Sequence, residues 1–497
     1  KQASTSDTPV LIVTQSEAEV AEKKKEKALK TWTFKATNVR DFAFASSRKF
    51  IWDAQNVKVG GKNIMAMSYY PKEGNPLWER YSTKLIAHTV KTYSKYTVDY
   101  PYPVAISVHS KWIGMEYPMI CFNGGRPESD GTYSEQTKYG MWGVIIHEVG
   151  HNFFPMIINS DERQWSWMDE GLNTFVQYLT EQEWERGYPS RRGPAYLIAD
   201  YMRGDKKRIS PIMTNSESIW QFGNNAYGKP ATALNILRET VMGRELFDYS
   251  FKIYCERWKF KHPSPADLFR TMEDASAVDL DWFWRAWFYT TDHVDISMDE
   301  VKSFELNTMN PEVEKSVTKD SDSKKDKFIG DTRNKELIKE TINEKDGNID
   351  DFYANHDKYA VDAIDKADYE KLKTSISEEE LALLNAGKQF YEIHFTNVGG
   401  VPMPLILQFT FEDNTTEVIR IPAEIWKIHE EKVSKIFIFD KKVSGIRLDP
   451  FLETADTDLN NNTWPAEKAS TRFELFKSSQ TKENPMQRDQ RLKEMGN

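Results

Sequence analysis

Cysteine is scarce in this chain, which has only Cys121 and Cys255 among its 497 residues. Two cysteines exclude a disulfide-stabilised scaffold and any cysteine-rich zinc or iron–sulfur centre. Basic charge is not in excess either, because the formal net charge is -10 at pH 7. This balance argues against a general binder of nucleic acid or of anionic membranes. No apolar run is long enough to span a bilayer, so we expect no transmembrane segment.

Aromatic residues, in contrast, are abundant. The chain contains 15 Trp and 27 Phe, and 39% of its residues are hydrophobic. Disordered chains are poor in such residues, so we expect a folded protein. Its length favours more than one domain.

The hydrophobic pattern divides the first 300 residues into two parts. In residues 1–47 a short strand at 9–15 and a charged helix from Ser16 precede an alternating strand pair at 31–47, and we expect the edge of a larger unit. Residues 48–300 begin with strand-like segments and continue with helical periodicity. That order predicts an α+β domain.

A charged segment divides the rest of the chain. Residues 312–384 are rich in charge and poor in apolar residues, so we expect an insertion there. From Gln389, short strands recur at regular spacing, which predicts a β-sandwich over 301–465 around this insertion. Residues 466–497 are highly charged and are expected to form a tail.

The most informative segment is VIIHEVGHNFFP, residues 144–155, within a helix predicted to run to Phe154. Residues four apart lie on the same face of a helix, so His147 and His151 can hold one ion between their imidazoles. Glu148 lies about 100° further round the helix, close to such an ion but not aligned to bind it. This HExxH arrangement predicts two zinc ligands and a glutamate that removes a proton from the attacking water.

The alternative interpretation is a buried helix whose histidines have ordinary protein partners. The helix is apolar nearly all round, from Met141 to Phe154, so it is expected to be buried. Three ionisable groups on a buried helix are costly unless something pairs them. A metal ion pairs all three, and we therefore favour the metal site.

A catalytic zinc site needs a third protein ligand and one open position. Glu170 follows His151 after eighteen residues and opens a second predicted helix in QWSWMDEGLNTF. Asp169 is the competing ligand. We favour Glu170 because its helix places it on one face with Thr174 and Gln177, and we expect Asp169 to be a cap or a partner of a ligand.

HExxH followed after eighteen residues by the glutamate of WMDEG resembles the zinc signature of the gluzincin metallopeptidases. Within that group, the chain resembles the membrane-alanyl aminopeptidase family, which includes leukotriene A4 hydrolase. The resemblance implies a thermolysin-like catalytic domain and one zinc ion per chain, held by His147, His151 and Glu170. It also implies that Glu148 is the general base and that the substrates are peptides with a free N-terminus.

A second motif supports the same family. IGMEYP, residues 113–118, is similar to the family's GxMEN motif, with Tyr117 in the place of its asparagine. By this match, Glu116 binds the free α-amino group of a peptide. The backbone of Gly114 and Met115 lines the substrate as an added strand.

A third motif is NNAYGKPATAL, residues 224–234, which is similar to the family's YxKG stretch although Pro230 replaces its glycine. The match makes Tyr227 a hydrogen-bond donor to the oxyanion of the tetrahedral intermediate.

The flanking regions resemble the family in part. Residues 31–47 are similar to the strand pair that closes its N-terminal β domain, most of which we expect to be absent from this chain. The β-sandwich is similar to that of some bacterial members. Because such members are often exported, the resemblance implies a periplasmic or extracellular location.

Three functional hypotheses follow, and we favour a zinc-dependent aminopeptidase. A thermolysin-type endopeptidase would use the same three ligands and Glu148, but it would have no use for Glu116. A binding protein on a retired peptidase fold is a third hypothesis. Retired sites usually lose a ligand or the base, and this sequence has all of them.

Overall fold

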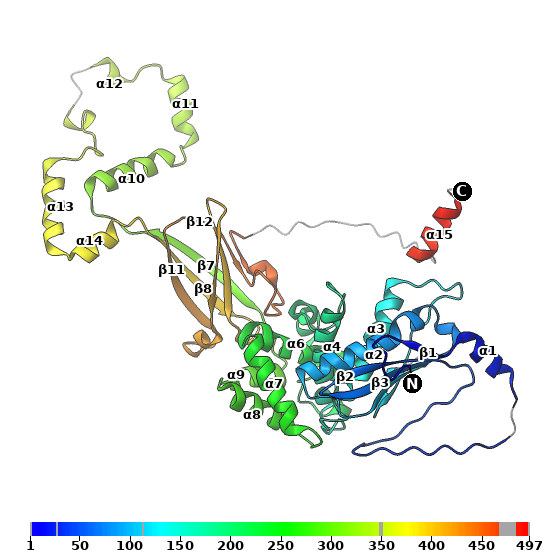
Figure 1. Ribbon diagram of the computed structural model, residues 1–497. Helices are drawn as coiled ribbons and strands as arrows, with labels where there is room; N and C mark the ends of the chain where they lie inside the picture. Colours follow the sequence, from blue (N-terminus) through cyan, green and yellow to red (C-terminus); the bar gives the residue numbers. More distant parts are fainter. Residues whose placement is uncertain (1, 26–27, 112–113, 347–350, 467–483, 496–497) are drawn as a thin grey trace.

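The fold combines a mixed α/β region with a two-sheet region, as the α+β multidomain prediction requires (Figure 1). None of the helices in the described part of the chain has the length and apolar composition needed to cross a bilayer. This computed structural model describes residues 2–25, 28–111, 114–346, 351–466 and 484–495.

A six-stranded sheet forms the first region. Its order is β1-β2-β3-β4-β6-β5, in which only the β3–β4 and β4–β6 pairs are parallel. β5 is an edge strand that pairs antiparallel with β6, so its other side is open to an added strand. The strands are β1 (Val10–Val13), β2 (Ile51–Val59), β3 (Lys62–Tyr70), β4 (Val104–His109), β5 (Gly114–Tyr117) and β6 (Ile120–Asn123).

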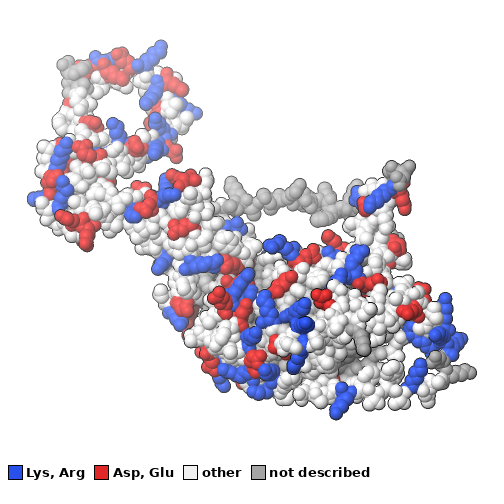
Figure 2. All heavy atoms as spheres, in the orientation of Figure 1, with Lys and Arg blue, Asp and Glu red and all other residues white. Residues whose placement is uncertain are grey.

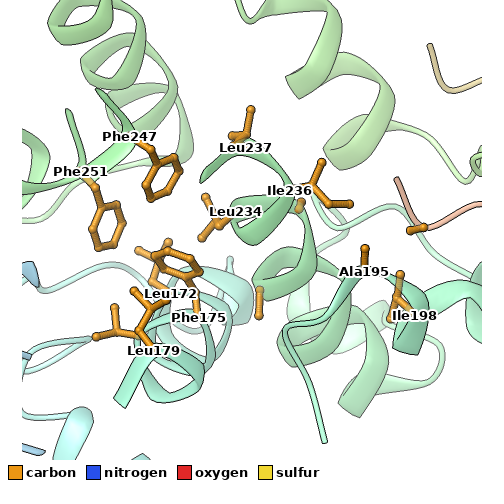
Figure 3. Packing of buried hydrophobic residues seen from close by; sticks show 14 of the residues in the cluster. Leu172, Phe175, Leu179, Ala195, Ile198, Leu234, Ile236, Leu237, Phe247 and Phe251 are labelled. Carbon is orange, nitrogen blue, oxygen red and sulfur yellow. The ribbon is translucent and has the colours of Figure 1, made fainter. Parts of the chain in front are cut away.

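Helices cover this sheet and bury its core. α2 (Leu77–Tyr96) lies against β2, β3 and β4, and α3 (Glu135–Gly150) lies against β4, β5 and β6. α4 (Ser166–Trp184) packs on both helices, and its apolar side chains meet those of α6 and α7 in one core (Figure 3). The other helices of this region are α1 (Gln15–Lys23), α5 (Ala199–Met202), α6 (Lys229–Ile236), α7 (Arg244–Trp258), α8 (Pro265–Ser276) and α9 (Asp281–Tyr289).

Gly150 lets α3 approach α2 and α4 closely. A Cβ added to Gly150 would lie 2.2 Å from Tyr93 Oη and 2.3 Å from Asn173 Oδ1. These two buried atoms are themselves joined by a hydrogen bond of 2.8 Å. A side chain at this position would therefore push the three helices apart.

We expect Gly150→Ala to lower the free energy of unfolding by about 1–3 kcal/mol, the usual cost of overpacking. Urea unfolding would measure it. Gly140→Ala on the same helix is the matched control, because no atom lies within 4 Å of its added Cβ. The control is expected to be neutral or to stabilise by up to about 1 kcal/mol. If the two variants unfolded at the same urea concentration, the packing argument would be wrong.

The second region is a sandwich of two antiparallel sheets. β8 to β12 lie where the sequence predicted short strands, whereas β7 and β13 were not predicted, and β7 begins at Ile296, before the predicted boundary at 301. One sheet has the order β10-β9-β12-β13 and the other β11-β8-β7. The sheets meet through aromatic side chains, since Phe409 lies with its ring centre 5.0 Å from Phe437 and 4.7 Å from Phe439. The strands are β7 (Ile296–Glu305), β8 (Gln389–Asn397), β9 (Leu405–Phe411), β10 (Thr416–Ile421), β11 (Lys432–Phe439), β12 (Val443–Leu448) and β13 (Thr463–Trp464).

Between β7 and β8 the chain leaves the sandwich and forms separate helices (Figure 1). They contain no buried residue, and acidic and basic side chains are interspersed over them (Figure 2). This segment coincides with the charged insertion predicted at 312–384. The helices are α10 (Pro311–Lys324), α11 (Ile329–Leu337), α12 (Ile342–Lys345), α13 (Ala363–Ser375) and α14 (Glu378–Leu384).

The strand pair predicted at 31–47 is wrong, because these residues contain no strand. Their aromatic residues alternate as in a strand, but the side chains have no sheet to cover. Four of them are exposed: Trp32, Phe34, Phe42 and Phe44. Alternation predicts a strand only where one face is buried, and the described chain buries neither face here.

Features near both ends of the chain differ in detail from the prediction. The first helix begins at Gln15 and is capped by Thr14 with Glu17, whereas the sequence predicted a helix that begins at Ser16. β1 pairs with β2 and so extends the six-stranded sheet. Of the tail predicted at 466–497, residues 467–483 and 496–497 lie outside the described residues, and α15 (Pro485–Met495) is helical.

Candidate metal centre and active site

α3 positions the two histidines of the HExxH motif. The helix is capped by Ser134 and ends at Gly150, short of the predicted end at Phe154, with His151 as its C-cap. The turn between the histidines is still helical, because the backbone N–H of His151 donates to the carbonyl of His147 at 3.1 Å. Both imidazoles therefore lie on one face, with their Nε2 atoms 3.0 Å apart.

α4 brings a carboxylate to these imidazoles. Glu170 Oε2 lies 3.1 Å from His147 Nε2 and 3.3 Å from His151 Nε2. The three donor atoms thus form a nearly equilateral triangle. In a tetrahedral zinc site with bonds of about 2.0–2.1 Å, neighbouring ligand atoms lie roughly 3.3 Å apart. The cluster therefore has the size and the donor chemistry that one zinc ion requires.

The other nitrogen of each imidazole faces an acceptor. His147 Nδ1 lies 2.9 Å from Gln177 Oε1, and His151 Nδ1 lies 2.8 Å from the carbonyl oxygen of Phe154. Asp169 Oδ1 also lies 2.9 Å from His151 Nδ1, as a charged neighbour without the geometry of a hydrogen bond. Acceptors at Nδ1 keep the proton there and leave the Nε2 lone pairs directed at the cluster. Two lone pairs and a carboxylate that face one another are stabilised by a cation.

Asn173, which sequence reasoning missed, holds the backbone of the motif. Its Nδ2 donates to the carbonyl of His147 at 2.9 Å, and its Oδ1 accepts from Tyr93 at 2.8 Å. Asn173 lies three residues after Glu170, on the same face of α4. That spacing was the one available indication of its position.

Glu148 is the buried carboxylate beside the cluster. It is 5% exposed, and its Oε2 has no hydrogen-bond partner among the described residues. Burial raises the pKa of Glu148 to about 7, although His147 and His151 act in the opposite direction. The group is thus placed and tuned to accept and release a proton.

The edge strand β5 passes directly over Glu148. A Cβ added to Gly114 would lie 2.3 Å from Glu148 Oε1 and 2.7 Å from Val144 Cγ2, so this approach requires glycine. Met115 is 39% exposed, and Gly114 is exposed as well. A peptide added to this edge would therefore lie next to the carboxylate of Glu148.

Glu116 lies on β5 and reaches the same cluster. Its carboxylate forms a group with His151 and Asp169 in which one potential ligand atom of each lies within 4.8 Å of the others. This group could hold a cation itself, and it shares His151 with the triangle of His147, His151 and Glu170. Glu116 is not part of that triangle and stands beside it as a separate carboxylate.

Tyr227 contacts the metal cluster through Glu170 and His147. It lies in a π-helical turn, Gly223–Gly228, that leads into α6. Its hydroxyl donates to Glu170 Oε1 at 2.6 Å, and its ring stacks on His147 with centres 5.8 Å apart. Burial and the charge of Glu170 raise the pKa of Tyr227, so the hydroxyl keeps its proton. A substrate oxyanion at the cluster would compete with Glu170 for this hydrogen.

A cavity of about 420 Å³ opens beside the cluster. Its walls come from α3, α4 and the segment 188–192, with Tyr227 at one side. Three charged side chains line it beyond the metal cluster and Glu148: Glu181, Arg191 and Arg192. No motif in the sequence indicated this cavity, because its walls come from segments far apart in the chain.

Comparison with known proteins gives a family match for one part of the chain. Residues 82–287 match the model described as the peptidase family M1 domain. This matched segment is called the M1 domain below. The M1 domain includes all of the cluster residues, and it confirms the predicted resemblance to the gluzincin aminopeptidases. The M1 domain and the donor triangle together support zinc as the cofactor.

Relatives of the M1 domain are named as aminopeptidases. "Probable aminopeptidase 1" of Sulfurisphaera tokodaii is 25% identical over 199 residues, which are 37% of this chain and 25% of that protein. "Aminopeptidase 2" of Candida albicans is 22% identical over 269 residues, which are 51% of this chain and 29% of that protein. The match thus spans less than a third of the length of either relative.

One solved structure shares the fold over most of the chain. It is the crystal structure of Legionella pneumophila aminopeptidase A in complex with aspartic acid, with a TM-score of 0.52 and 11% sequence identity. The match covers 82% of this chain and 38% of that chain. At this identity, the similarity concerns the fold alone.

Proposed function

We propose that this chain is a zinc-dependent aminopeptidase that removes N-terminal amino acids from peptides. The observation that supports it most is the position of Glu116. This carboxylate lies on an edge strand, beside a metal-binding triangle that it does not join. A fixed negative charge at that place selects a substrate by its free amino group, which an endopeptidase does not need.

In this proposal His147, His151 and Glu170 hold one zinc ion. When bound, zinc supplies Lewis-acid chemistry, because it polarises a carbonyl group and makes a water molecule more acidic. The imidazoles of His147 and His151 are held in the orientation that metal binding requires. Their neighbours are Gln177, Asp169 and the carbonyl oxygen of Phe154.

Glu148 acts as the general base. It takes a proton from the water that attacks the scissile carbonyl and then transfers it to the leaving nitrogen. Its buried, unpartnered Oε2 and its raised pKa suit both steps. Tyr227 donates its hydroxyl hydrogen to the oxyanion that forms on the carbonyl.

Glu116 and the free edge of β5 position the substrate. The N-terminal residue of a peptide extends the sheet beyond β5, along Gly114 and Met115. The carboxylate of Glu116 then pairs with the α-ammonium group, which places the first peptide bond at the cluster. The substrates are therefore peptides with a free N-terminus. We propose a periplasmic or extracellular location, which is supported by the resemblance of the β-sandwich to exported relatives.

The test is hydrolysis of one alanyl peptide with its amine free or acetylated, followed by analysis of the products. We expect release of alanine from the free peptide and no cleavage of the acetylated one. Equal cleavage of both peptides would show an endopeptidase. No cleavage of either, in protein that holds one zinc per chain, would favour the binding-protein hypothesis.

Glu116→Gln is expected to lower kcat/KM for the free-amine peptide by about 10- to 100-fold, as loss of a charge-assisted hydrogen bond implies. The acetylated peptide is expected to stay uncleaved, so kcat/KM for the free-amine peptide is the readout. Glu245→Gln, which changes an exposed carboxylate on α7, is the control and is expected to keep this kcat/KM. An unchanged kcat/KM in Glu116→Gln would remove Glu116 from substrate binding.

A further inference from the structure

Arg192 has an unusual environment in the cavity beside the metal cluster. It is half-buried, and its guanidinium carbon lies 4.4 Å from the centre of the Tyr227 ring. Its guanidinium has no hydrogen-bond or ion-pair partner among the described residues. A guanidinium stays charged and offers five N–H donors, so this group can bind an anion.

Two carboxylates line the same cavity, Glu148 and Glu181, and neither forms an ion pair with Arg192. Both carboxylate oxygens of Glu181 already accept hydrogen bonds, one from Ser190 Oγ and the other from Gln177 Nε2 at 2.8 Å. Because Gln177 also contacts His147 through its oxygen, its amide orientation is fixed. Away from Glu148, the cavity therefore combines a satisfied carboxylate with a guanidinium that has no partner among the described residues.

The positions of Glu116 and Arg192 give the direction of the substrate. Glu116 stands on the side of the cluster with His151 and Asp169, whereas Arg192 stands on the side with His147 and Tyr227. A peptide whose amine is held by Glu116 crosses the cluster with its first carbonyl. Its second residue then enters the cavity.

We propose that Arg192 binds a carboxylate of the substrate's second residue, so that this chain prefers peptides that carry a negative charge there. The inference rests on the proposed aminopeptidase function. Two kinds of carboxylate can accept hydrogen bonds from the N–H groups of this guanidinium: the side chain of Asp or Glu, and the free C-terminus of a dipeptide. Arg191, exposed at the cavity, adds positive charge on the same side.

The test compares release of alanine from four dipeptides: Ala-Glu-amide, Ala-Gln-amide, Ala-Ala-amide and Ala-Ala with a free C-terminus. The Glu and Gln peptides differ only in charge, and the two Ala-Ala peptides differ only at the C-terminus. We expect kcat/KM at least about tenfold higher for one charged peptide than for its neutral partner, as a buried charged hydrogen bond implies. The pair that shows the difference identifies which carboxylate is bound.

Arg192→Gln is expected to bring the ratio of kcat/KM between the charged and the neutral peptide close to one. Arg192→Lys is expected to keep part of this ratio, because lysine retains the charge but lacks the paired N–H donors of a guanidinium. Arg203→Gln, an exposed arginine paired with Asp200, is the control and is expected to keep the whole ratio. If Arg192→Gln only disturbed packing, kcat/KM would fall for both peptides of a pair, and the ratio of the two values would stay unchanged.

Two results would overturn the inference alone: neutral and charged peptides cleaved equally by the unaltered protein, or a charge preference that persists in Arg192→Gln. Both leave the aminopeptidase proposal intact, since alanine is still released. Release of alanine from none of the four peptides, in zinc-loaded protein, would overturn the aminopeptidase proposal and this inference together.

Discussion

Glu148→Gln is expected to lower kcat/KM for an alanyl peptide by about 10²- to 10⁴-fold, the range that general-base catalysis contributes. Glutamine has nearly the same shape but cannot accept the proton of the attacking water. Because Glu148 Oε2 has no hydrogen-bond partner among the described residues, the substitution breaks little of the surrounding structure. Steady-state kinetics would measure the loss of kcat/KM, and zinc analysis of the same sample would measure the bound metal.

The zinc content of Glu148→Gln is expected to stay near one per chain, since Glu148 is not part of the donor triangle. Glu245→Gln provides the control for removing one carboxylate from the surface. Turnover within a few-fold of the unaltered protein would exclude Glu148 as the base. Loss of zinc from this variant would instead make Glu148 a ligand.

Glu170→Gln is expected to lose most of the bound zinc and essentially all turnover. Its Oε2 is one corner of the donor triangle, and its Oε1 holds the hydroxyl of Tyr227. Asp169→Asn is the informative comparison, because Asp169 contacts only the outer nitrogen of His151. Loss of such an outer partner typically weakens metal binding by about 10- to 100-fold, which is less than loss of a ligand.

Zinc affinities of the two variants, measured by competition with a chelator, therefore rank the two carboxylates. The greater loss is expected in Glu170→Gln. The opposite order would transfer the ligand role to Asp169 and would favour the group that Asp169 forms with His151 and Glu116.

Local patterns predicted much of the site. Four-residue spacing on a helix requires His147 and His151 to share a face, and the structure places their Nε2 atoms 3.0 Å apart. The strands β8 to β12 of the sandwich were equally predictable, because alternation there accompanies one buried face. The same alternation at 31–47 gave a wrong strand pair, since the described chain offers no surface for those aromatic residues to cover.

Contacts between distant segments were beyond sequence reasoning. The hydrogen bond from the Tyr227 hydroxyl to Glu170 depends on a π-helical turn against α4. The guanidinium of Arg192, which has no partner among the described residues, lies in a cavity lined by α3, α4 and the segment 188–192. The early end of α3, which places the carbonyl of Phe154 at His151, is a local feature that was not predicted either. Such placements follow from tertiary packing, which neither periodicity nor a motif records.

The most direct measurement of the central claim is a zinc titration of metal-stripped protein, with alanine release from the free-amine alanyl peptide as the signal and the acetylated peptide in parallel. Activity is expected to disappear on stripping, to return in proportion to added zinc, and to saturate at one ion per chain, with the free-amine peptide alone cleaved. Activity that survives stripping, or that returns equally for both peptides, would contradict the central claim.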